Sequence, residues 1–110
     1  MSINSTIKAA LELVAPVEAD TYEGDQAVYI TFGYNSIPDD FGDDEPAHER
    51  FLIDVHLFAP TGYNTLSLRR AIKRALSDAG TTWPVYENVS DKDGQHHVFE
   101  CELVAAAGVE

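Results

Sequence analysis

Apolar and polar side chains alternate along residues 50–58, and this two-residue period predicts a β-strand. One face of the strand is entirely apolar: Phe51, Ile53, Val55 and Leu57. The other face mixes apolar and polar side chains: Leu52, Asp54, His56 and Phe58. Because β-branched and aromatic residues are frequent here, we expect this strand to lie in the middle of a sheet. Pro60 and Gly62 then end it in a turn.

A helix is predicted directly after this turn, from a cap at Asn64 or Thr65 to Ala79, with Gly80 suited to a left-handed C-terminal cap. Apolar residues recur along one stripe of that helix: Leu68, Ala71, Ile72, Ala75, Leu76 and Ala79. Four of the seven Lys and Arg residues of the chain lie on the opposite, exposed face: Arg69, Arg70, Lys73 and Arg74. We expect the apolar stripe to pack on the apolar face of residues 50–58.

Similar patterns predict the remaining elements. Apolar residues at helical spacing predict a first helix, which Ser2 or Ser5 can cap and which Pro16 ends near residue 15. Residues 17–20 are expected to form a short extended segment. Strands are predicted at residues 27–34, 85–90 and 95–106, with a tight turn at 91–94. The order α-β-β-α-β-β therefore predicts a single α+β domain, with a mostly antiparallel four-stranded sheet and both helices packed on one face.

Residues 36–47 break the periodicity and predict a long, mobile loop between two antiparallel strands. Five carboxylates surround Phe41 in this segment: Asp39, Asp40, Asp43, Asp44 and Glu45. We interpret the segment as a solvated loop. One alternative is an assembly arm that meets a basic surface on another subunit; another is a calcium site, although the spacing departs from the EF-hand pattern. Residues 105–110 are expected to be a frayed tail.

Length and composition narrow the class of protein. The chain has 110 residues, of which 45% are hydrophobic, so it can form one folded domain with a core. We recognise neither a membrane-spanning apolar run nor a signal peptide. The formal net charge of −12 argues against nucleic acid and anionic membranes as partners, and it favours partners with basic patches.

Histidine and cysteine give no recognised metal or redox motif. His96 and His97 are adjacent on a predicted strand, so they point to opposite faces and cannot easily bind one metal ion. His48 and His56 lie before or on a different strand. The single cysteine, Cys101, excludes an internal disulfide and a CxxC zinc site, and it fits a reducing, intracellular compartment. We expect no metal and no cofactor, and we interpret Cys101 as a buried small hydrophobic residue.

One group of side chains has the composition of an acid–base cluster. Asp54 and His56 share a face with Glu100 or Glu102 if their strands are neighbours, and a small enzyme could use such a set. A partly solvated sheet face, or a subunit interface, explains the same residues without chemistry. The chain has no phosphate-binding glycine loop and no nucleophile motif. We therefore expect no catalytic residue.

The charges of the chain are segregated along the sequence. The basic helix face can bind phosphate or nucleic acid, or it can simply be solvated. A sharper hypothesis pairs it with the acidic loop of a neighbouring copy, because opposite charges far apart on one small domain suit a head-to-tail contact that can close into a ring. The inferred interface residues are Asp39, Asp40, Phe41, Asp43, Asp44, Glu45, Arg69, Arg70, Lys73 and Arg74.

Several segments follow one another over roughly residues 7–104: a short first helix, a strand ending in TFGYN, an acidic FGDDEP loop, the strand ERFLIDVHLFAP, and a helix with LRRAIKRAL that leads to GTTWP. In this order and texture the chain resembles the small tail proteins of long-tailed phages and prophages, in particular the tail-terminator, or tail-to-head joining, group. The resemblance implies a non-enzymatic structural protein that forms a ring, commonly hexameric, on the end of the tail tube.

Such a ring stops the growth of the tube and docks to the head. The resemblance therefore implies three partners: further copies of the chain, the tail tube protein and the head connector protein. It also implies two locations, the host cytoplasm during assembly and the virion tail. The alternative from another class is an acidic adaptor, whose loop mimics nucleic acid and blocks a basic protein partner; five clustered carboxylates and a pI near 4.4 favour it.

Overall fold

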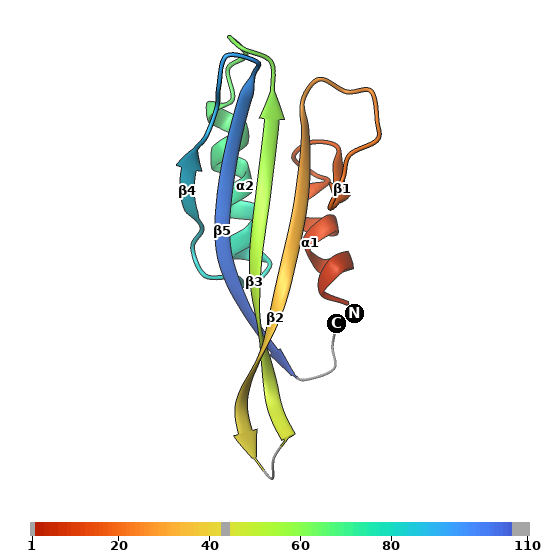
Figure 1. The fold of residues 1–110 in the computed structure, drawn as a ribbon, viewed down its shortest axis with the longest axis vertical. Helices are drawn as coiled ribbons and strands as arrows, with labels where there is room; N and C mark the ends of the chain where they lie inside the picture. Colours follow the sequence, from red (N-terminus) through yellow and green to blue (C-terminus); the bar gives the residue numbers. More distant parts are fainter. Residues whose placement is uncertain (1, 43–44, 107–110) are drawn as a thin grey trace.

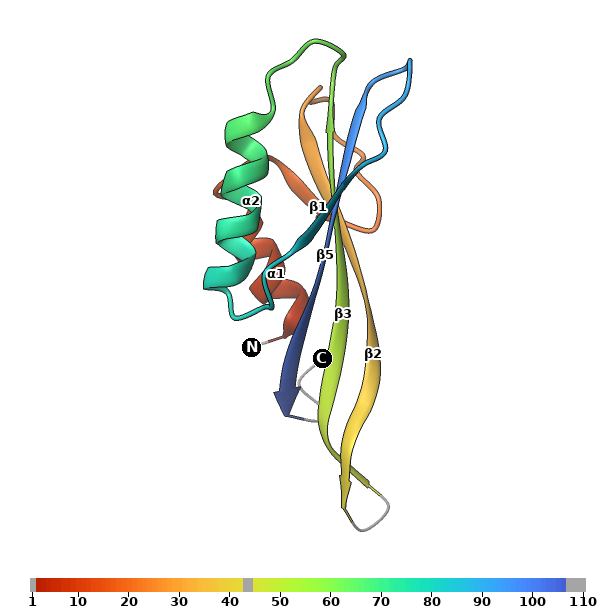
Figure 2. The ribbon, with the colours of Figure 1, turned by 90° about the vertical axis from the view of Figure 1, so that its left-hand side faces the viewer.

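The computed structural model describes the backbone of residues 2–42 and 45–106, and the side chains of residues 2–37 and 49–104. Two helices and five strands follow one another in the order α1 (Ile3–Leu11), β1 (Val17–Ala19), β2 (Tyr29–Gly42), β3 (Glu45–Ala59), α2 (Leu66–Asp78), β4 (Val85–Asn88) and β5 (Gln95–Ala106). The strands form one sheet in the order β1-β2-β3-β5-β4 (Figure 1). Both helices lie on the same face of this sheet (Figure 2).

The predicted α+β fold, with two helices on one side of a sheet, is confirmed, but the sheet has five strands and is mixed. β1 pairs in parallel with β2, while the other neighbours are antiparallel. Backbone bonds hold β1 in place, from Ile30 to the Pro16 carbonyl at 2.8 Å and from Asp20 to the Phe32 carbonyl at 2.8 Å. A strand of three residues is too short to show a period, so the sequence predicted only an extended segment there.

The predicted loop at residues 36–47 is wrong for most of its length, because β2 and β3 continue through it. Their register runs on from Ile37 opposite Arg50 to Gly42 opposite Glu45. Pairing between the two strands satisfies the backbone N–H and C=O groups whatever the side chains are, so a charged composition does not prevent a ladder. Asp43 and Asp44 lie outside the described residues.

The predicted frayed tail is also wrong at its start. Ala105 and Ala106 belong to β5 and pair with Glu49 and His48 of β3. Residues 107–110 lie outside the described residues. The last strand therefore has the bounds that its two-residue period predicted, 95–106.

A single core lies between the helices and the sheet. The apolar face predicted for the central strand is confirmed, since Phe51, Ile53, Val55 and Leu57 are all buried. Neighbouring strands and both helices complete the core with Ile30, Phe32, Phe99, Ile7, Leu11, Ile72 and Leu76. Both helices lie on this side, so neither helix covers the opposite face of the sheet, which we call the open face (Figure 2).

The helix ends follow local hydrogen bonding. Ser2 caps α1 by accepting a bond from the Ser5 amide at 3.1 Å, and the regular helix ends at Leu11, four residues before the predicted end. At α2 the Asn64 carboxamide oxygen accepts from the Leu66 amide at 3.1 Å. Gly80, with φ of 103°, occupies the left-handed position predicted for it. Within the described part of the chain, neither helix has the length and apolarity to cross a membrane.

One end of the β2–β3 hairpin extends past the rest of the structure (Figures 1 and 2). The last pair that β5 makes with β3 joins Ala106 to His48. Beyond it, among the described residues, β2 and β3 pair only with each other, as in Phe41 opposite Pro46. We call residues 38–42 and 45–48 the arm. It helps to make the molecule 54 Å long but only 24 Å and 22 Å across.

Leu76→Ala should lower the free energy of unfolding by about 2–5 kcal/mol, because it leaves a cavity among fully buried side chains. Leu66→Ala is the matched control: it makes the same change on the same helix, at a side chain that is 44% exposed, and should cost less than about 1 kcal/mol. Urea unfolding followed by circular dichroism measures both. Equal losses would show that the apolar stripe of α2 does not face the sheet.

Candidate functional site

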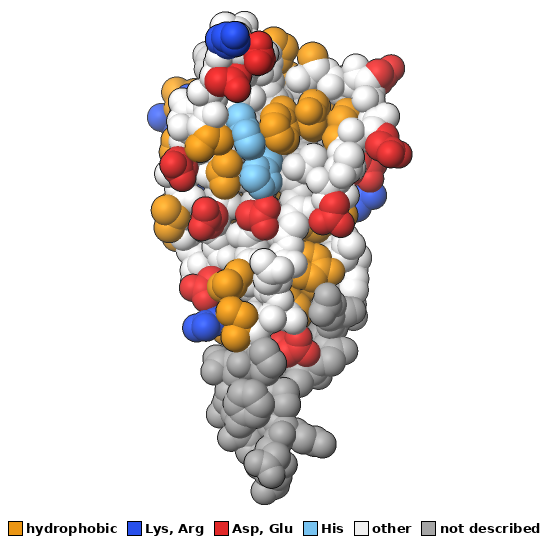
Figure 3. Space-filling view, viewed as in Figure 1, with side chains coloured by type: hydrophobic (Ala, Val, Ile, Leu, Met, Phe, Trp, Pro, Cys, Tyr) orange, Lys and Arg blue, Asp and Glu red, His pale blue; other side chains and the backbone are white. Residues whose placement is uncertain are grey.

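The open face of the sheet carries the polar groups of the molecule that are best placed for function. Its side chains come from alternate positions of the three central strands: Tyr29, Thr31 and Gly33 from β2, Leu52, Asp54, His56 and Phe58 from β3, and His96, Val98, Glu100 and Glu102 from β5. Figure 3 shows histidine, apolar and acidic side chains side by side on this face.

A chain of three hydrogen-bonded side chains crosses the open face. Asp54 Oδ2 lies 2.8 Å from His56 Nε2, and His56 Nδ1 lies 2.7 Å from His96 Nε2. Because a carboxylate accepts, His56 donates through Nε2, and Nδ1 of the neutral ring is then an acceptor toward His96. Burial, followed by the nearby charge of His56, lowers the pKa of His96, while Asp91 opposes the shift. The neutral form of His96 is therefore favoured.

A row of stacked rings holds His96 from the side. The rings of Tyr22 and Tyr29 stack at 4.3 Å, those of Tyr29 and Phe58 at 5.0 Å, and those of Phe58 and His96 at 4.4 Å. These contacts link the β1–β2 connection to β2, β3 and β5. They restrict the orientation of the His96 ring, so the hydrogen bond to His56 is preorganised.

A hollow of about 340 Å³ lies beside the histidines, over Gly33. A Cβ atom at Gly33 would lie 3.4 Å from Asp54 Oδ1 and 3.7 Å from Asp20 Oδ1. The glycine therefore leaves room for two carboxylates that approach the same point. Asp20 itself has a positive φ of 63°, in the left-handed region that aspartate tolerates.

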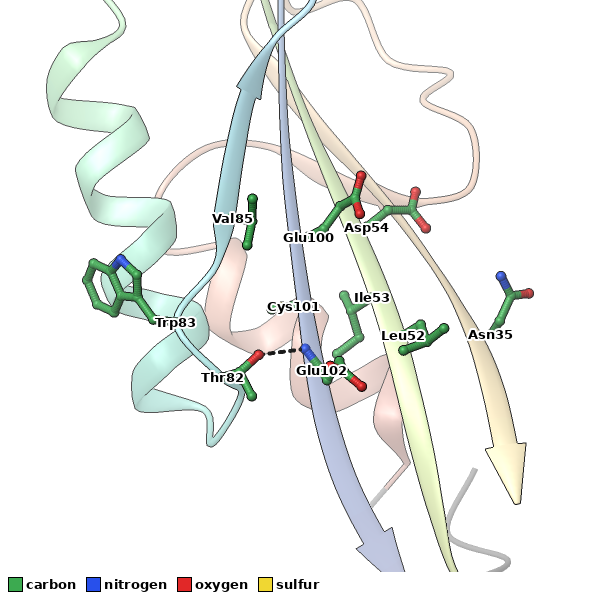
Figure 4. Close-up of a pocket in the computed structure, with 10 residues that line it drawn as sticks. All are labelled: Asn35, Leu52, Ile53, Asp54, Thr82, Trp83, Val85, Glu100, Cys101 and Glu102. Atoms are coloured by element: carbon green, nitrogen blue, oxygen red, sulfur yellow. Dashed lines mark hydrogen bonds between the residues drawn. The ribbon is translucent and has the colours of Figure 1, made fainter. Parts of the chain in front are cut away.

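A second groove, of about 380 Å³, lies on the same face toward β4 (Figure 4). Asp54 and Glu100 are directly opposite each other on β3 and β5, so two carboxylates stand side by side. The Thr82 hydroxyl accepts from the Glu102 amide at 3.0 Å and fixes one wall. Trp83 and Val85, which are 56% and 72% exposed, make the other wall apolar.

The predicted acid–base cluster is formed only in part. The structure brings Asp54 and His56 together, but Glu102 Oε1 lies 3.3 Å from Arg50 Nε instead. The third member of the cluster is His96, because it is directly opposite Phe58 and diagonal to His56. The two-residue period places His96 on this face, but only the register between β3 and β5 shows which side chain it meets.

His97, on the other face of β5, has a structural role that the sequence did not indicate. It is 2% exposed and hydrogen-bonds through Nδ1 to the Tyr86 hydroxyl at 2.7 Å. Its Nε2 lies 2.8 Å from Gln95 Oε1 and 3.3 Å from Thr65 Oγ1. Burial, with a smaller contribution from the Arg69 charge, lowers the pKa of His97. These hydrogen bonds connect the start of α2 to β4 and β5.

The predicted basic face of α2 is less exposed than expected, because β4 and the segment before it cover part of it. Arg69 donates to the Tyr86 hydroxyl at 3.1 Å, and the Lys73 ammonium lies 5.0 Å from the centre of the same ring. Arg74 lies over Trp83 at 5.8 Å. Arg70 and Arg74 remain exposed, so two cations face outward from this helix.

The acidic interface residues divide between the arm and the undescribed turn. Asp39, Asp40 and Phe41 belong to β2, and Glu45 begins β3. Their side chains are outside the described ones, as are Asp43 and Asp44 altogether. Among the side chains that the structure describes, no group of three or more metal-ligating residues occurs.

Comparison with known proteins supports the fold only. No family model matches the chain, and no curated protein matches it. Nine chains of solved structures do match. One of them, a protein whose name states no activity, has a TM-score of 0.58 and 13% sequence identity over 94% of this chain and 86% of its own. At that identity the likeness shows a shared fold and nothing about function.

Tyr86→Phe should lower the free energy of unfolding by about 1–3 kcal/mol, because it leaves His97 Nδ1 without its buried partner and removes the acceptor of Arg69. Tyr63→Phe is the matched control at a side chain that is 49% exposed, and it should change stability by less than about 0.5 kcal/mol. Thermal and urea unfolding measure both variants. A Tyr86→Phe protein as stable as the control would refute the structural role of this hydroxyl.

Cys101 should react slowly with iodoacetamide at pH 8 in the folded protein. The side chain is 6% exposed, and burial raises the pKa of its thiol, while a hydrogen bond from Thr81 opposes the shift. Burial shields the sulfur and the raised pKa lowers the fraction of reactive thiolate, so folding should slow alkylation by about tenfold or more. Mass spectrometry with and without urea gives the ratio; equal rates would contradict the burial.

Proposed function

We propose that this chain is a non-enzymatic structural protein that assembles with copies of itself through the arm. In the proposal the copies form a ring that ends the tail tube of a phage or prophage and joins it to the head connector. The observation that carries the proposal is the arm. It extends beyond the helices and the end of β5, and past the pair of His48 with Ala106 its two strands pair only with each other in the described structure.

An arm of this kind gains stability from a second surface. A two-stranded ribbon is marginal in water by itself, and unpaired strand edges are available to another chain. The outer edge of β2 pairs with β1 only over residues 30–32, so the described part of β2 beyond them has no strand on that side. A neighbouring copy that packs on the arm would bury this edge.

Charge supports a head-to-tail arrangement of the copies. The sequence of the arm contains Asp39, Asp40 and Glu45, whereas Arg70 and Arg74 are exposed on α2. Figure 2 shows that α2 and the arm occupy different parts of the long axis. Two different patches of one subunit make a heterologous contact, and such contacts generate rings when the rotation closes.

The tail setting rests on the resemblance of the sequence segments, and the fold is compatible with it. In this setting the further partners are the tail tube protein and the head connector protein, and the protein passes from the host cytoplasm into the virion tail.

The open face supplies a second surface, on which like charges such as Asp54 and Glu100 stand opposite each other. Adjacent like charges are unfavourable until a basic partner neutralises them.

That same open face favours a second candidate, an acidic adaptor that binds a basic protein. A pull-down from the producing cells distinguishes the two functions. Recovery of tail tube or connector proteins supports the assembly role. Recovery of nucleic-acid-binding proteins that added DNA releases from the bait supports the adaptor, because a nucleic-acid mimic and DNA compete for the same basic site.

Charge reversal tests the arm-to-helix contact directly. Asp39→Lys with Asp40→Lys replaces two acidic groups of the arm by cations, and Arg70→Glu with Arg74→Glu replaces the two exposed cations of α2 by carboxylates. Each double variant alone should weaken self-association, because the changed charges repel the patch that they meet. An equal mixture should recover assembly, because alternating copies restore opposite charges. Sedimentation velocity, with and without purified tail tubes, gives the sizes.

The matched control for the helix variant is Lys8→Glu with Lys92→Glu, which makes the same change in net charge on α1 and on the β4–β5 turn. It should assemble like the wild type. Added salt should weaken the wild-type contact, since exposed ion pairs are screened over about 10 Å at 0.1 M salt. Variants that assemble singly, or a mixture that does not recover, would show that the contact lies elsewhere.

A further inference from the structure

Two imidazole nitrogens from neighbouring strands face each other on the open face. His56 Nδ1 and His96 Nε2 are 2.7 Å apart, and the ring centres are 5.0 Å apart with a tilt of 38°. The rings therefore meet edge to edge and do not stack. Both side chains are half-buried and line the hollow over Gly33, so a small ion can reach them from solvent.

We propose that His56 and His96 form a binding site for a transition-metal dication such as Zn²⁺. Imidazole nitrogen is a preferred ligand of Zn²⁺, Cu²⁺ and Ni²⁺, whereas Ca²⁺ and Mg²⁺ prefer oxygen. With no third ligand grouped beside the pair among the described side chains, water completes the coordination. The proposal is independent of self-assembly.

Asp54 prepares His56 for this role. Its carboxylate accepts from Nε2 of His56 at 2.8 Å, which leaves the lone pair on Nδ1, the nitrogen that faces His96. A carboxylate on the far nitrogen of a metal-ligating histidine fixes the ring tautomer and raises its basicity. His96 becomes a ligand when the proton on its Nε2 moves to Nδ1, so no proton has to leave the pair.

The change in geometry that metal binding requires is small. A zinc–nitrogen bond is about 2.0–2.1 Å long, so two ligands at a tetrahedral angle are about 3.4 Å apart. The two nitrogens have to separate from 2.7 Å by less than 1 Å, which small side-chain rotations provide. Phe58 stacks on His96 at 4.4 Å and keeps that ring on the same side during the change.

The electrostatic surroundings favour a cation at this position. Asp20 and Asp54 both direct a carboxylate oxygen at the space over Gly33, next to the histidines. Glu100 stands opposite Asp54 on β5. These carboxylates act on the ion through space, in a chain whose formal net charge is −12. The acidic groups alone would select no metal; the two imidazoles supply the preference.

Isothermal titration of the full chain with ZnCl₂ at pH 7.5 tests the site. We expect one ion per chain, and we expect His56→Ala and His96→Ala each to weaken binding by more than about a hundredfold, since even an outer partner is worth about 10–100-fold. Asp54→Asn should weaken binding by about tenfold. The control is His48→Ala, which removes an imidazole eight residues along β3, about 27 Å away, and should leave binding unchanged.

Nitrogen-15 NMR of the wild-type imidazoles gives a second measurement, which does not depend on any substitution. Zn²⁺ should shift the resonances of His56 Nδ1 and His96 Nε2, and it should leave His97 in place. Circular dichroism of each variant without metal separates lost binding from lost fold. The proposal is overturned if the wild type binds no Zn²⁺ up to 1 mM, if both alanine variants bind as the wild type does, or if the shifts appear at other histidines.

Discussion

The two-residue alternation of the central strand is the constraint on which the rest of the structure depends. β3 pairs with β2 on one side and with β5 on the other, so its register determines the faces of both neighbours. The fully buried side chains of Phe51, Val55 and Leu57 hold this register against the helices. A slip of one residue would move Asp54 and His56 into the core and would expose the apolar face.

Much of this architecture could be predicted from the sequence, because the relevant signals are local. The alternation in residues 50–58 and 95–106, the apolar stripe of α2 and the glycine at its end all have the predicted positions. The two parts that the sequence did not predict have different causes. β1 is a strand only because β2 lies beside it, and the arm is a hairpin although its composition resembles that of a loop.

The candidate site could also be predicted from the sequence only in part. Its residue types and shared face could be predicted from the period of β3, but the third member could not. His96 meets His56 because of a register that links positions 40 residues apart, and Glu102 pairs instead with Arg50. That side chains cover part of the basic face of α2 was not predicted, for a related reason. Tyr86 and Trp83 contact the cations only after β4 has folded against β5.

The fold thus leaves two features without a partner inside the described molecule, the arm and the open face, and we propose that the arm serves assembly. Hydrogen exchange of the arm amides, compared between free protein and protein bound to tail tubes, tests that claim most directly. We expect rapid exchange in residues 38–42 and 45–48 of the free protein and at least about tenfold slower exchange after assembly, with the core of β3 and β5 unchanged. Equal exchange of the arm in both states would contradict it.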